Sequence, residues 1–158
     1  MVKFMYTVFI GILLAALVGV GIAAFYTKPV QPEYPESAIK APSEMATQAD
    51  FKNQHEDNIK QAAYQKASEL YNRNVALLAV AFSLVILSIS LTVLRAVSLF
   101  ADGVLLGGTI TLVYGIIRSF GSGQQKFMFI MVAVGLVVSM ALGYIKIVKP
   151  DGKLHSGK

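Results

Sequence analysis

The sequence predicts an all-α membrane protein, a four-transmembrane-helix bundle with an extramembrane segment between the first two spans. Hydrophobic residues make up 55% of the 158 residues and charged residues only 15%, whereas a soluble domain has roughly 25% charged residues. The apolar residues also fall in blocks of about 20. This is the length that a helix needs to cross a ~30 Å hydrocarbon core with its backbone hydrogen bonds satisfied internally.

The first span is expected over residues 4–26, which carry no charged side chain. A cleaved signal peptide is the alternative, because Gly21 and Ala23 supply small residues for a cleavage site. A signal peptide, however, has an apolar core of about 7–15 residues behind a basic start, and only Lys3 is basic here. A retained span is therefore the better prediction.

Residues 27–74 form the one long polar connection. Pro29, Pro32 and Pro35 recur every third residue, which places them on one stripe of a polyproline II helix. Residues 43–74 contain no glycine or proline and are rich in Ala, Gln, Glu and Lys. They predict a polar helix that begins after an N-cap at Ser43 and continues into the second span.

The lengths of these two parts suggest that they pair. The proline-rich residues 27–42 reach about 50 Å in polyproline II geometry, and the helix rises about 46 Å. An upright stalk would then place Pro32 near Ala62 and Ala63, and Pro35 near residues 55–59. The alternative is a flexible linker followed by a helix that lies on the membrane surface.

The second and third spans are expected over residues 75–94 and 103–120. Only Arg95 and Asp102 interrupt the apolar sequence between Val75 and Arg118. One helix over residues 75–120 would be about 69 Å long and could not fit the bilayer. Asp102-Gly103 supplies turn chemistry, so Asp102 is predicted to cap the third helix and to form a local ion pair with Arg95.

The fourth span is expected over residues 127–148 and is followed by a basic tail, residues 149–158. Lys146 and Lys149 can extend toward the water at its end. An even number of spans places both termini on one side, and the lysine-rich tail favours the cytoplasm. The net charge of +5 then fits a cytoplasmic rim beside anionic lipid and not a nucleic-acid surface.

Small residues recur at helical spacing in three of the spans. Such faces let helix backbones approach closely inside a bilayer. Packing within one chain is the favoured interpretation, and self-association through an unused face is the alternative. The residues are Gly11, Ala15, Gly19 and Ala23 in the first span, Gly107, Thr111, Gly115 and Ser119 in the third, and Gly135, Ser139 and Gly143 in the fourth.

Groups that carry out chemistry are scarce. There is no cysteine, and no span has a charged side chain near its middle, where proton relays and ion paths place one. His55 and His155 are far apart in the sequence and lack the partners of a metal site. Neither an enzyme nor a cofactor, metal or catalytic site is expected, and Asp102 is expected to do no proton chemistry.

Three stretches support a resemblance: residues 71–76 (YNRNVA), 101–108 (ADGVLLGG) and 142–146 (LGYIK). Together with the first span and the proline-rich linker, they resemble uncharacterised small four-span membrane proteins of candidate-phyla bacteria with reduced genomes. The resemblance covers nearly the whole chain. It implies a bacterial cell-membrane setting and brings with it no activity, cofactor or catalytic residue.

The function expected from these features is a non-enzymatic membrane scaffold or accessory subunit. Its partners would be the lipid bilayer and either a protein that contacts residues 27–74 or a second copy of the chain. The alternative is a small oligomeric channel or transporter, and flux in proteoliposomes would separate the two. In the absence of charges its path would need hydroxyl groups, from Ser83, Ser88, Ser90, Thr92, Thr109 and Thr111.

Overall fold

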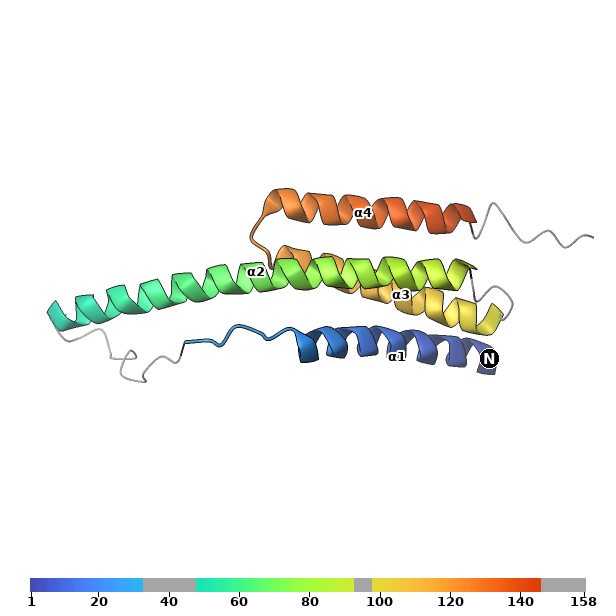
Figure 1. Ribbon diagram of the computed structural model, residues 1–158, viewed down its shortest axis with the longest axis horizontal. Coiled ribbons are helices and arrows are strands. Elements are labelled where there is room, and N and C mark those ends of the chain that lie inside the picture. Colours follow the sequence, from blue (N-terminus) through green and yellow to red (C-terminus); the bar gives the residue numbers. More distant parts are fainter. Residues whose placement is uncertain (33–47, 93–97, 146–158) are drawn as a thin grey trace, which may run out of the picture.

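The structure is a computed structural model that describes residues 1–32, 48–92 and 98–145. Within these ranges the chain forms four helices and no strand (Figure 1). They are α1 (Val2–Phe25), α2 (Gln48–Thr92), α3 (Ser98–Phe120) and α4 (Gln125–Gly143). All four are long and apolar enough to cross a membrane. The prediction of an all-helical chain with four candidate spans is therefore confirmed.

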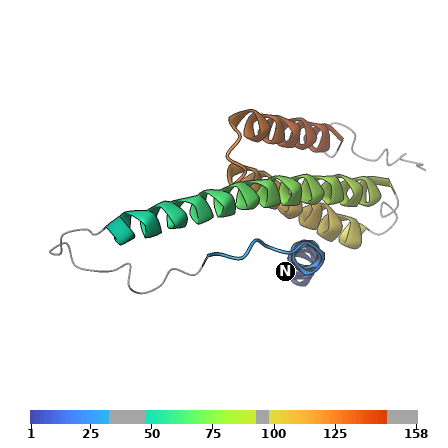
Figure 2. The same ribbon diagram turned by 60° about the vertical axis from the view of Figure 1, so that its left-hand side comes forward.

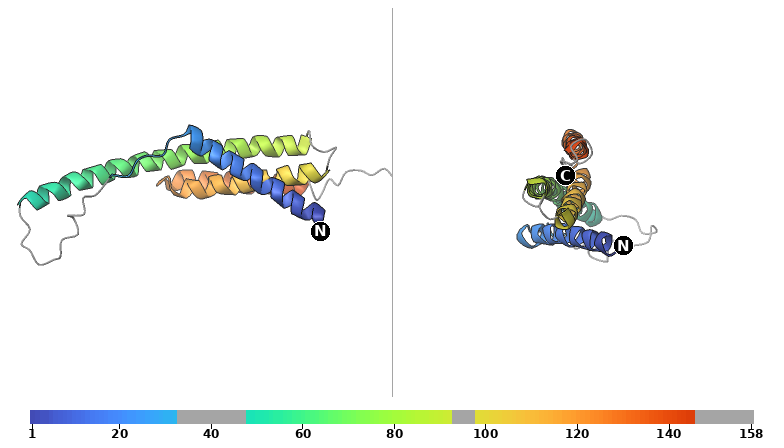
Figure 3. Two further views of the ribbon diagram at one scale, coloured as in Figure 1. Left: turned by 90° about the horizontal axis from the view of Figure 1, so that it is seen from below. Right: turned by 90° about the vertical axis from the view of Figure 1, so that its right-hand side faces the viewer.

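The antiparallel pair α2 and α3 forms the centre of the fold, and α1 and α4 lie on opposite sides of it (Figure 3). In the most apolar stretches of α2 and α3, 39% and 33% of the residues are buried, compared with 11% in α1 and in α4. The outer helices therefore leave most of their apolar surface facing away from the protein. A bilayer accepts such a surface because lipid tails are as apolar as the side chains.

Glycines bring α2 and α3 close together. A Cβ atom at Gly115 would lie 2.9 Å from Val80 Cγ2 and 3.2 Å from the Ala76 carbonyl oxygen. Two turns earlier, a Cβ atom at Gly108 would lie 2.8 Å from Leu87 Cδ2. From Gly108 to Gly115 the backbone of α3 thus lies close against α2, which the absent side chains permit.

The outer helices use separate contacts. On α4, Met131 joins the buried Val80 and Leu112 in an apolar cluster. On α1, Tyr6 packs edge-on against Phe100 of α3, with ring centroids 6.1 Å apart. In the views from below and from the end, α1 crosses the central pair obliquely (Figure 3).

One continuous helix, α2, forms both a span and a projection. Its 45 residues rise about 67 Å, more than twice the ~30 Å of a hydrocarbon core. The N-terminal half extends beyond the ends of α1 and α3, as the view turned by 60° also shows (Figure 2). We call its residues 48–70 the rod.

The third helix begins earlier than predicted. Asp102 is not its N-cap, because α3 already includes Ser98 and Asp102 lies in its second turn. Gly103 is buried, and a Cβ atom there would lie 3.0 Å from Ile10 on α1. The Asp-Gly pair thus does not form a turn: the glycine provides close packing between helices, and tertiary contact outweighs local turn preference.

Several predicted features lie outside the described residues. They are Arg95 and its ion pair with Asp102, the N-cap at Ser43, Pro35, and Lys146, Lys149, His155 and the basic tail. Asp102 itself is half-buried and has an interaction partner. The fourth span as described ends at Gly143, and its predicted last residues belong to the same undescribed end.

Candidate functional site

The most elaborate polar arrangement lies where the rod meets the spans. Arg118, near the end of α3, donates from Nη1 to Asn72 Oδ1 on α2 at 2.8 Å and from Nε to the Tyr114 hydroxyl at 3.2 Å. Its guanidinium carbon lies 5.4 Å from the Tyr71 ring centroid and 5.8 Å from that of Tyr114. A guanidinium near two aromatic faces and bound to two oxygens has little rotational freedom left.

The same place also fixes the end of α1. Tyr26, directly after that helix, stacks on Tyr71 with ring centroids 5.4 Å apart and an interplanar angle of 28°. Asn74 Nδ2 donates to the Tyr26 hydroxyl. Three helices therefore meet in one set of contacts. We call the set the rod-base cluster, consisting of Tyr26, Tyr71, Asn72, Asn74, Tyr114 and Arg118.

The turn between α3 and α4 packs onto α2 beside this cluster. Asn72 Nδ2 donates to the Gly121 carbonyl oxygen at 3.0 Å. Gly123 has a φ of +66°, a left-handed conformation that glycine adopts without steric cost. A Cβ atom at Gly123 would lie 2.7 Å from the carboxylate carbon of Glu69. Glycine is thus favoured here by the backbone angle, and a larger residue would also require the flexible Glu69 side chain to move.

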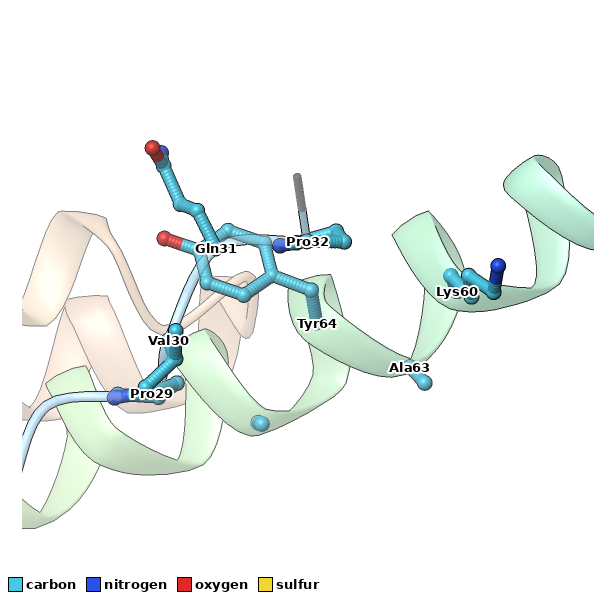
Figure 4. A pocket seen from close by; sticks show the side chains of 8 residues that line it. Pro29, Val30, Gln31, Pro32, Lys60, Ala63 and Tyr64 are labelled. Atoms are coloured by element: carbon cyan, nitrogen blue, oxygen red, sulfur yellow. The ribbon is translucent and has the colours of Figure 1, made fainter. Parts of the chain in front are cut away.

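A groove runs along the rod between α2 and the chain that follows α1 (Figure 4). Tyr64 extends from α2 toward the extended chain in this view. Pro32 and Ala63 line the same groove. The full lining is Pro29, Val30, Gln31, Pro32, Lys60, Ala63, Tyr64 and Ala67.

The predicted small-residue faces are only partly used. Gly11 is buried, and a Cβ atom there would lie 3.0 Å from Leu106 on α3. A Cβ atom at Gly107 would lie 3.0 Å from the Gly11 carbonyl oxygen, and one at Gly135 would lie 2.5 Å from Ile116.

Other members of these faces contact less. At Gly19 and Gly143 no other described part of the chain comes within 4 Å of such a Cβ position. Ala15 is half-buried and Ala23 is exposed. The α1 face thus packs on α3 at its N-terminal end and is open farther along.

The hydroxyl groups proposed for a polar path mostly bond within their own helices. Ser88, Thr92, Thr109 and Thr111 each donate to the carbonyl oxygen four residues earlier. Ser90 donates across the helix pair to the Ala101 carbonyl oxygen at 2.7 Å. Ser83 is fully buried, and its Oγ has no partner in the part of the chain described.

Sequence reasoning did not identify the rod-base cluster. Its members belong to three helices that are far apart in the chain, and no periodic pattern connects them. The usable signal was local: tyrosines and one arginine at span ends, the composition typical of a membrane boundary. Among the described residues no group of three His, Asp or Glu side chains is placed to hold a metal ion.

Comparison with known proteins adds no family to these observations. No protein-family model, no curated protein and no solved structure matches the chain.

Proposed function

We propose that this chain is a non-enzymatic membrane scaffold or accessory subunit, which holds the rod at a fixed angle for a protein partner outside the cytoplasm. The observation that carries the proposal is the continuity of α2. A single 45-residue helix is both a membrane span and the rod, so the two move as one body. A freely jointed linker would leave the position of the rod undefined.

The rod-base cluster supports a fixed angle. Arg118 connects α3 to α2 through Asn72, and Tyr26 connects the end of α1 to the same turn of α2 by stacking on Tyr71. These contacts tie α2 to both α3 and the end of α1 at the point where it leaves the bundle. Such restraint is useful to a protein that positions a partner.

The rod also exposes side chains suited to binding. Ile59 and Leu70 are 57% and 50% exposed, respectively, and neither lines the groove beside the proline-containing chain. Exposed Glu56 and Lys66 lie on the same helix. Apolar side chains within a polar surface are typical of a transient protein interface.

Photocrosslinking in native membranes tests the proposal. A photoreactive amino acid at Ile59 or Leu70 should give one stoichiometric adduct with another protein, whereas the same group at the exposed Phe129 of α4 should give lipid adducts. Adducts only with a second copy, together with solute flux in proteoliposomes, would overturn the scaffold and favour the channel.

The orientation within the proposal is that both termini are cytoplasmic and the rod is extracytoplasmic. Because the chain has no cysteine, single cysteines can be introduced at the exposed Lys66 and Lys3. An impermeant thiol reagent on intact cells should label position 66 and not position 3. The opposite result would reverse the orientation.

A further inference from the structure

A second function is suggested by the charge of Arg118, independently of the scaffold proposal. The groups that hold this guanidinium are all neutral: an amide oxygen, a phenol hydroxyl and two aromatic rings. Among the described residues the partners of Arg118 include no carboxylate, and the Glu69 carboxylate lies beside Gly123 in the adjoining α3–α4 turn. The positive charge is therefore fixed in position by neutral groups and has no direct carboxylate partner among the described residues.

The guanidinium also keeps unused donors. Arginine carries five N–H groups, and its hydrogen bonds to Tyr114 and Asn72 use one on Nε and one on Nη1. The remaining donors suit a group with several acceptor oxygens. Phosphate is such a group, and arginine binds it with paired hydrogen bonds.

The position of Arg118 favours a lipid as the source of the phosphate. Arg118 lies in the last turn of α3, so a bilayer crossed by α3 has its headgroups at this level. Ile117 and Phe120 on either side are 61% and 56% exposed and offer apolar surface to acyl chains. Lys126, exposed in the first turn of α4 after a short connection, adds positive charge at the same end.

We propose that Arg118, held by Asn72, Tyr71 and Tyr114, binds the phosphate of an anionic phospholipid headgroup at the boundary of the membrane. The lipid would neutralise the one charge that the rod-base cluster leaves uncompensated. Its binding would therefore also strengthen the junction between the rod and the spans.

Lipid retention by the full-length protein tests this proposal. The protein would be exchanged into nanodiscs containing phosphatidylglycerol and phosphatidylcholine, and the lipids that stay bound would be counted by native mass spectrometry. Wild type should prefer phosphatidylglycerol. Arg118→Gln should reduce that preference about tenfold, the effect of losing charge-assisted hydrogen bonds. Arg118→Lys keeps the charge but lacks the planar guanidinium, so its preference for phosphatidylglycerol should lie between those of wild type and Arg118→Gln.

The matched control is Lys66→Gln, which removes the same charge from the exposed rod and should leave the preference unchanged. Equal retention by wild type and Arg118→Gln would overturn the proposal. A second measurement compares thermal stabilisation of the protein by inorganic phosphate and by phosphatidylglycerol in detergent. Stabilisation by the lipid alone supports a headgroup site, and equal stabilisation by both would contradict it in favour of a soluble anion.

Discussion

The backbone of Gly107 on α3 lies directly against the carbonyl oxygen of Gly11 on α1, so closely that a Cβ atom at position 107 would come within 3.0 Å of that oxygen. The Leu14 side chain would be equally near. A backbone oxygen cannot move aside as a flexible side chain can. This contact therefore fixes the distance between α1 and the central helix pair.

Gly107→Val should separate α1 from α3 and lower the free energy of unfolding by about 1–3 kcal/mol, the usual cost of overpacking. The control is Gly19→Val on α1, where the added atoms meet open space. Unfolding titrations in mixed micelles measure both variants. Equal losses would mean that the Gly19 face is also occupied, and a change of oligomeric state in Gly19→Val alone would favour self-association through it.

Asn72→Ala should destabilise the junction between the rod and the spans. The variant loses both the donor to the Gly121 carbonyl and the acceptor for Arg118, worth about 1–3 kcal/mol together. Asn58→Ala, on the exposed part of the rod, is the matched control and should change little. Hydrogen exchange of the α3–α4 turn provides the site-specific measurement, and unchanged protection there would contradict the assignment.

The membrane-spanning pattern was readable from sequence because one requirement dominates it. Every backbone polar group in lipid must be satisfied within the segment, so uncharged blocks predict helices directly. The spacing of small residues predicted faces for close packing, and at Gly107 and Gly135 an added Cβ atom would meet a neighbouring helix. Which small residues face a neighbouring helix, and which meet open space as Gly19 does, depends on helix rotation and not on spacing.

The start of α3 and the rod-base cluster could not be predicted in the same way. Asp102-Gly103 carries a strong local turn preference. In the structure Ser90 donates to the Ala101 carbonyl oxygen and Ile10 packs against Gly103, and these contacts keep the first turns of α3 helical. The cluster depends on Arg118 meeting Asn72, residues 46 positions apart. Contacts of this kind are consequences of the three-dimensional arrangement, and a single sequence does not encode them as a pattern.

Gly123→Ala should destabilise the α3–α4 turn for two separable reasons. The φ of +66° costs an alanine about 1–2 kcal/mol, and the new methyl group would collide with the Glu69 carboxylate. Adding Glu69→Ala should remove only the collision. A double-mutant cycle on unfolding free energy measures the coupling, and zero coupling would show that Glu69 moves aside without cost.

Ala63→Glu should displace the proline-containing chain from the rod while leaving the spans intact. Ala63 lines the groove with Pro32, and a carboxylate there would fill it. Ala62→Glu is the matched control, because Ala62 is exposed and does not line the groove. Spin labels at the exposed Val30 and Lys66 should give a narrow distance distribution that broadens only in Ala63→Glu. The same breadth in both variants would indicate a flexible linker.

Ser83 and Ser90 are two buried serines of α2 that differ in their hydrogen bonding. Ser83 Oγ is fully buried without a hydrogen-bond partner among the described residues, whereas Ser90 donates to the Ala101 carbonyl oxygen. Ser83→Ala should leave stability unchanged or raise it by up to about 1 kcal/mol, since an unsatisfied buried hydroxyl is removed.

Ser90→Ala should lower the free energy of unfolding by about 0.6 kcal/mol, the average for a hydrogen bond between membrane helices. Unfolding of both variants under identical micelle conditions makes the comparison. A loss in Ser83→Ala as large as in Ser90→Ala would mean that the Ser83 hydroxyl has a partner in the membrane, such as water or a second chain. That result would favour the polar path of the channel alternative, because a hydroxyl with a non-protein partner at this depth is what such a path requires.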